Sequence, residues 1–241
     1  TGAISLLQIQ TEFGGSGTIG LSEYYRNGLY VTSNNTGIPT SGVISMSSFR
    51  GAVRSRTVEY QIIGAGGGGG FGQEDGGATS RAPGGGESRI ASTSITNVVA
   101  AGGLGGLNAN LGWNTTVDRN GQATIYGLGG AAGGNRSNGS PAPTTSYGAG
   151  GGGSGGDPSS TYDSSGNSGS RGGAGTYITG SKQIIPGIVL TVTIGVKGLG
   201  GDSTFDGGAG ANGYARIRKD TGPAGAFGAW VVFTANGTFT V

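Results

Sequence analysis

The residues that come closest to a recognised chemical motif are the glycines that follow the apolar run Tyr60–Ile63. Residues 64–69 match the G-x-G-x-x-G pattern of dinucleotide-binding proteins. That pattern binds a pyrophosphate when a helix follows, because the phosphate lies at the helix N-terminus. Residues 70–77 have no apolar residues at helical spacing, and Glu87, at the offset of a ribose-binding acid, follows glycines instead of a strand. The sequence therefore does not favour a nucleotide site.

Other catalytic chemistry has little support. The chain contains no Cys and no His, which excludes thiol nucleophiles, Cys/His zinc sites and histidine acid–base mechanisms. The acid pairs lie in glycine-rich or serine-rich stretches, where the rigid placement that a glycosidase needs is hard to achieve. They are Glu74/Asp75, Asp157/Asp163 and Asp202/Asp206. We interpret them as solvated loop acids, and we expect no enzymatic activity and no cofactor.

Composition narrows the class of protein further. Glycine accounts for 59 of 241 residues, and only 11% of the residues are charged. The net charge of +2 does not indicate nucleic-acid binding, and no apolar run approaches the length of a membrane span. Apolar residues are grouped into strand-like runs, which favours a folded chain. The stretch GGDSTFDGG, residues 200–208, resembles a calcium-binding repeat but does not recur, so no metal site is predicted.

Three stretches within residues 1–57 share the layout of a capped helix with a hydrophobic staple. In each, an apolar residue precedes the cap and packs against another five residues later; the pairs are Ile4 with Ile9, Ile19 with Tyr24, and Ile44 with Phe49. The expected N-cap residues are Ser5, Gly20 and Ser45. In the first two, the side chains of Gln8 and Glu23 are expected to accept a hydrogen bond from the backbone N–H of the N-cap residue. Helices this short are unstable alone. We expect them to dock on each other or on a neighbouring subunit; a small independent globule is the alternative.

Residues 58–219 alternate glycine runs with strand-like segments. The predicted strands are Val58–Ile63, Ile95–Val99, Ala123–Tyr126, Thr176–Ile178, Ile188–Val196 and Tyr214–Arg218. Strands of this quality argue against a flexible linker, and irregular glycine spacing with seven prolines argues against collagen. A packed sandwich of polyglycine II helices fits best, because chains without side chains approach closely enough to exchange backbone hydrogen bonds. The predicted fold class is mainly β and irregular, with short docking helices at the N-terminus.

Two groups of motifs carry a resemblance to tailed-bacteriophage proteins. ISLLQIQTEFGGSGTIGLSEYY followed by SGVISMSSFRGA resembles the N-terminal part of many tail, baseplate and tail-fibre proteins. VEYQIIGAGGGGGFG, IIPGIVLTVTIGVKGLGG and GANGYARIRK, in that order, look like landmarks of glycine-rich domains in phage tail fibres and tip adhesins. In those domains a polyglycine sandwich displays variable loops that grip host receptors.

One departure from that family lies at the C-terminus. Residues 220–241 include WVVFTANGTFTV, which predicts a β-hairpin with an Asn236-Gly237 turn. Family members usually place such a hairpin directly before the strand equivalent to Val58–Ile63. We therefore expect it to pair beside that strand, in the same subunit or in a neighbour.

The resemblance implies a virion tail component, made in the host cytoplasm, that attaches through residues 1–57 to other tail or baseplate proteins. It would bind a host surface polysaccharide or outer-membrane protein through loops of the glycine-rich domain, as a homo-oligomer in which a trimer is favoured. The alternative is a purely structural spacer or assembly protein. Ice binding would want a regular Gly-x-x array, which is absent. Loop aromatics and arginines are the receptor-binding candidates: Tyr147, Tyr162, Trp113, Phe71, Phe205, Arg136 and Arg171.

Overall fold

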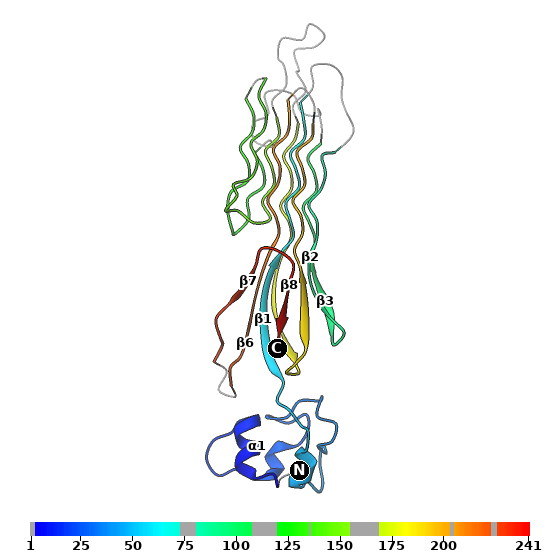
Figure 1. Ribbon diagram of the computed structural model, residues 1–241, viewed down its shortest axis with the longest axis vertical. Coiled ribbons are helices and arrows are strands. Elements are labelled where there is room, and N and C mark those ends of the chain that lie inside the picture. The colour runs from blue at the N-terminus through cyan, green and yellow to red at the C-terminus, as the bar shows by residue number, and fades with distance from the viewer. Residues whose placement is uncertain are drawn as a thin grey trace.

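The protein is elongated, with three tiers along its long axis (Figure 1). The computed structural model describes residues 3–72, 81–107, 120–134, 136–154, 169–202, 205–222 and 226–241. A module of short helices forms one end, two β-sheets form the middle, and extended glycine-rich runs form the other end. The expected fold class, mainly β and irregular with N-terminal helices, is confirmed.

The three predicted N-terminal helices are present. Helix α1 spans Leu6–Phe13, and two 3-10 helices span Leu21–Tyr24 and Met46–Phe49. Ser5 and Gln8 form the expected capping box: Oγ of Ser5 accepts from N of Gln8 at 3.2 Å, and Oε1 of Gln8 accepts from N of Ser5 at 2.8 Å. The second helix lacks this box, because its cap, Gly20, has no side chain.

These helices pack on one another around a shared core. The staple residues Ile9, Tyr24 and Phe49 are buried in it, and their partners Ile4, Ile19 and Ile44 are partly buried against it. Phe13, Tyr24 and Phe49 meet edge to face, with ring centroids 6.0–6.5 Å apart. The helices therefore find their docking partners within residues 3–52.

The middle tier is a sandwich of two four-stranded antiparallel sheets. The first sheet, in the order β4-β1-β6-β7, consists of β1 (Arg56–Ile63), β4 (Tyr177–Ile184), β6 (Tyr214–Lys219) and β7 (Val231–Phe233). The second, in the order β3-β2-β5-β8, consists of β2 (Ser88–Ser92), β3 (Ile95–Ala100), β5 (Val189–Thr193) and β8 (Gly237–Thr240). Alternate residues of both sheets, among them Ile62, Ile217, Ile90 and Leu190, share one apolar core.

The expected C-terminal hairpin is wrong. β7 pairs with β6 in the first sheet, and β8 pairs with β5 in the second, so the two strands do not pair with each other. Neither lies beside β1, whose neighbours are β4 and β6. The side chain of Asn236 is the physical reason: its Oδ1 accepts a 2.8 Å hydrogen bond from N of Ile194 and holds the crossing segment against the second sheet.

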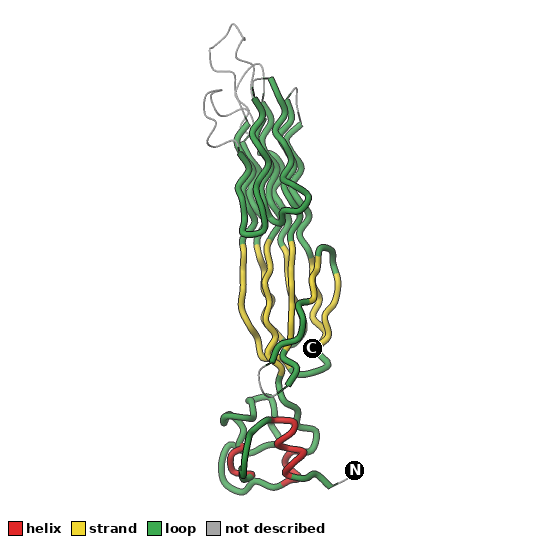
Figure 2. Tube along the Cα trace, turned by 90° about the vertical axis from the view of Figure 1, so that its left-hand side faces the viewer, coloured by secondary structure: helices red, strands yellow, loops and turns green. Residues whose placement is uncertain are grey.

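The glycine runs continue from the strands as a bundle of extended chains, which we call the glycine bundle (Figure 2). Run 64–70 is buried at its centre. Its successive N–H groups donate in rotation to runs 169–176, 81–86 and 205–213. The bonds are Gly64 to Thr176, Ala65 to Gly86, Gly66 to Ala211, Gly67 to Gly173, Gly68 to Pro83, Gly69 to Gly208 and Gly70 to Ser170. Donors three residues apart bond to the same neighbouring run, because a polyglycine II helix has three residues per turn.

The carbonyls of the central run accept from three further runs, 101–106, 148–154 and 195–201. Gly103 and Gly106, for example, donate to Ala65 and Gly68 at 2.8 Å. The central run thus has three neighbours that accept from it and three that donate to it. This is the packing expected of polyglycine II helices, and it uses the N–H groups that a nucleotide site would need.

Candidate functional site

Two regions carry the candidate residues: the end of the glycine bundle farthest from the sheets, here called the distal end, and the N-terminal module. Ser154 donates to Gly70 at the distal end, and Ser170 donates to Leu107. Bridges between Gly72 and Phe205 and between Arg81 and Leu107 also lie there. The described residues 70–72, 81, 107, 154, 170 and 205 therefore lie at the distal end.

Four of the predicted receptor-binding residues lie toward the distal end. Phe205 forms a bridge with Gly72, and Phe71 directly precedes Gly72. Arg136 lies in a turn closed by N of Ser137 donating to O of Gly134, and its positive φ of 51° marks the tightness of that turn. Arg171 follows Ser170 in the run beside the central chain. The fold brings these four residues to one end of the molecule. Trp113 and Tyr162 lie outside the described residues.

Tyr147 lies elsewhere, where the bundle meets the sheets. It belongs to a cluster of tyrosines, with ring centroids 4.8 Å from Tyr214 to Tyr147 and 4.9 Å from Tyr214 to Tyr126. The hydroxyl of Tyr126 donates to Oε1 of Gln61 at 2.9 Å. Burial, reinforced by Tyr177, raises the pKa of Tyr126 to about 12. The cluster packs against the outer face of the first sheet, so Tyr147 lies at the opposite end of the glycine bundle from the distal-end residues.

A groove on the side of the bundle was missed by sequence reasoning. It holds about 350 Å³ and is lined by Arg81, Arg171 and Gln122 together with residues 102–105 and 173–174. The fold pairs Arg81 with Arg171 because the runs containing them flank run 101–107. In the sequence the two arginines are 90 positions apart in separate glycine-rich stretches, so no spacing reveals the pair.

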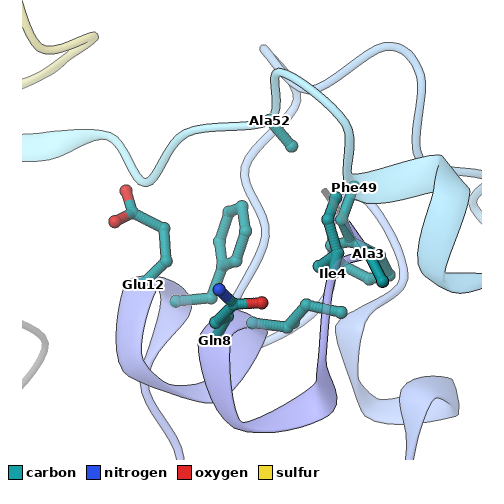
Figure 3. Close-up of a pocket in the computed structure, with 8 residues that line it drawn as sticks. Ala3, Ile4, Gln8, Glu12, Phe49 and Ala52 are labelled. Atoms are coloured by element: carbon teal, nitrogen blue, oxygen red, sulfur yellow. The ribbon is translucent and has the colours of Figure 1, made fainter. Parts of the chain in front are cut away.

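The N-terminal module has an open groove of about 380 Å³, shown in Figure 3. Three of the predicted docking residues, Ile4, Ile9 and Phe49, line it, whereas Ile19, Tyr24 and Ile44 belong to the module's core. Gln8 and Glu12 project from α1 at its edge (Figure 3). The groove is therefore apolar at its base with polar groups on one side.

A buried carboxylate joins the module to the sandwich. Asp220, only 3% exposed, accepts from both terminal nitrogens of Arg54, at 2.5 and 3.2 Å, and from N of Thr57 at 2.7 Å. Burial on its own would raise the pKa of Asp220, but these hydrogen bonds outweigh it and hold the pKa below its ordinary value. N of Arg54 also donates to Oε1 of Glu12 on α1 at 3.0 Å.

In the described part of the chain, no three Asp, Glu, Cys or His side chains gather as metal ligands would. No described helix is long and apolar enough to cross a bilayer. Comparison with protein-family models, curated proteins and solved structures found no match to this chain.

Proposed function

We propose that this protein is a tail component of a tailed bacteriophage that is attached through residues 1–57 and contacts the host surface with the distal end. The observation that carries the proposal is the placement of two kinds of surface at opposite ends of one elongated body (Figure 1). The helical module lies at one end, with a groove that is apolar at its base and has polar groups on one side. Phe71, Phe205, Arg136 and Arg171 lie toward the other.

The glycine bundle suits a platform for recognition. Its central run is hydrogen-bonded on all sides, so the described residues at its distal end are held in fixed positions. Rigid scaffolds that carry binding residues on connecting segments are a general solution for recognition. Binding would be non-covalent, through aromatic faces and arginines, without a cofactor. The oligomeric state, with a trimer favoured, stays a prediction.

Apolar side chains on the sides of the bundle favour a second candidate, a structural role in tail assembly. Leu104 is 70% exposed and Leu128 is 73% exposed, and Val196 and Leu199, three residues apart on one run, are also exposed. Side chains three residues apart lie on the same face of a polyglycine II helix. Such stripes suit lateral packing against another tail protein.

Competition with phage adsorption tests the proposal. Purified protein is added to candidate bacterial hosts before infection, and the adsorption rate of phages that infect them is measured. We expect saturable inhibition of at least one phage whose particles react with antibodies to this protein. If particles carry the protein but adsorption is unaffected at saturating protein, the structural role replaces receptor binding. If no phage particle reacts, the tail assignment is wrong.

A further inference from the structure

We propose that the groove between Arg81 and Arg171 binds an anionic group, a carboxylate or a phosphate, on a surface glycan. The inference rests on the proposed function for the location of its ligand. The two arginines lie at the distal part of the groove, and Gln122 lies nearer the sheets, since its side chain accepts from N of Ala174 at 2.8 Å.

Electrostatics favours an anion. Two arginines, Arg81 and Arg171, line the groove from runs on either side of run 101–107. One of them is already oriented: Nη1 of Arg81 donates to O of Gly105 at 2.9 Å. A guanidinium held in place by a backbone contact keeps other N–H groups for a ligand, and its planar fork matches carboxylate and phosphate oxygens.

The balance of hydrogen-bonding groups points the same way. The groove's acceptors are largely used: O of Leu104 accepts from N of Gly173, O of Gly105 accepts from Arg81, and Oε1 of Gln122 accepts from N of Ala174. Among the described residues, N of Leu104 and N of Gly105 donate to no acceptor, and neither does the side-chain amide of Gln122. A site with spare donors and occupied acceptors favours a ligand rich in oxygen acceptors.

The size of the groove limits the ligand. A volume of about 350 Å³ lies at the lower end of small-molecule sites and suits one sugar unit better than a peptide segment. Leu104, exposed in the wall, adds an apolar surface for a sugar ring. The ligand class is therefore a single acidic or phosphorylated sugar unit within a longer polysaccharide.

Titration of the intact protein, followed by amide NMR, tests the inference. The probes are digalacturonate for the carboxylate, inorganic phosphate for the phosphate, and a neutral galactose disaccharide as the control ligand. We expect saturable shifts of the Leu104, Gly105 and Gln122 amides with at least one anion and none with the neutral sugar. The anion that binds more tightly shows whether the acidic group on the glycan is a carboxylate or a phosphate. Absence of saturable shifts with both anions would overturn the inference.

Two arginine variants complete the test. R171Q and R81Q should each weaken anion binding by about tenfold or more, the loss expected for one charge-assisted contact. The matched control is R50Q, which removes an exposed arginine from the N-terminal module. Circular dichroism checks that each variant is folded. If R171Q and R81Q bind the anions as the wild type does, the inference fails.

Cell binding separates this inference from the proposed function. If wild type, R81Q and R171Q bind host cells equally, the groove is not the glycan site, while receptor binding stands. If the anions bind in the groove but no host cell is bound, the groove stands as an anion site and receptor binding fails.

Discussion

Gly68 lies so close to Leu199 that a Cβ atom added to Gly68 would overlap the carbonyl oxygen of Leu199. The same holds along the central run, where Gly66 faces O of Ala149 and Gly67 faces O of Leu104. These atoms belong to backbone and cannot rotate away. Glycine is needed at these positions because neighbouring chains approach too closely for any side chain, and none of the three has a positive φ.

We therefore expect Gly68→Ala to destabilise the protein by about 3 kcal/mol or more, at the upper end of overpacking costs, because the obstacle is backbone. Gly134→Ala is the matched control, since nothing lies within 4 Å of a Cβ at Gly134. Thermal and urea unfolding of both variants measures the difference. Equal stability of the two would show that the bundle is looser than described.

The core of the N-terminal module yields a second prediction. The buried hydroxyl of Tyr24 donates to O of Gly14 at 2.8 Å, so Tyr24→Phe leaves a buried carbonyl without its donor. The expected cost is about 1–3 kcal/mol. Tyr25→Phe is the control, because the hydroxyl of Tyr25 donates to O of Gly42 at an exposed site where water replaces it. Urea unfolding should rank Tyr24→Phe below Tyr25→Phe; the reverse order would contradict the described core.

Asp220 gives a third prediction. Asp220→Asn leaves the guanidinium of Arg54, itself mostly buried, without its charged partner. We expect the free energy of unfolding to fall by about 3 kcal/mol, because removing one member of a buried ion pair leaves the other charge buried without compensation for its desolvation. Glu87→Gln is the control, since it breaks an exposed pair with Arg89. Thermal unfolding distinguishes them, and an unchanged midpoint for Asp220→Asn would refute a structural role for this pair.

The same carboxylate predicts a pH dependence. The pKa of Asp220 is lower in the folded protein than its ordinary value of 3.8, so the unfolded chain binds its proton first as the pH falls. The stabilisation is present above about pH 4 and is lost as the pH falls through the folded-state pKa. Urea unfolding between pH 6 and pH 2 should show this loss in the wild type. The free energy of unfolding of Asp220→Asn should fall less over this pH range, because the variant lacks the contribution of Asp220. If the free energies of both proteins fall in parallel, Asp220 does not cause the loss.

The sequence predicted which kind of secondary structure each tier contains. It did not predict which segments lie side by side within a tier. The three capped helices and the strands that became β1, β3, β4, β5 and β6 were predicted because their apolar spacing is specific. Which glycine run lies beside which could not be predicted, because a run without side chains carries no pattern that selects a neighbour. Backbone donors and acceptors are the same in all of them.

Three local errors have physical reasons. β2, with the sequence SRIAS, was missed because only Ser88 and Ile90 are buried and the alternation is too short to recognise. Ala123–Tyr126 was predicted as a strand but forms only a bridge from Thr124 to Gly127. The turn signal at Asn236 was read as a hairpin, although its side chain secures a crossover between the two sheets.

The candidate site was predicted in part. Tyr147 was predicted as a receptor-binding candidate because, with Tyr162, it brackets the longest polar loop expected from the sequence. Run 148–154 then carries the chain from Tyr147 along the bundle, and seven residues at the rise of a polyglycine helix span about 20 Å. Phe71, Phe205, Arg136 and Arg171 do lie toward one end, because the fold brings residues 70–72, 134–137, 170–171 and 205 to the distal part of the glycine bundle.

Binding of the labelled full chain to intact host cells tests the central claim, that the two ends have different roles, most directly. The wild type is compared with a distal-end variant, Phe205→Ala with Arg136→Gln, and with a module variant, Ile4→Asp, after circular dichroism shows that all are folded. The account predicts saturable binding by the wild type and unchanged binding by the module variant. The distal-end variant should bind with an affinity lower by about tenfold or more, which is the usual effect of removing anchor residues from an interface. Binding that survives in the distal-end variant but is lost in the module variant would contradict it.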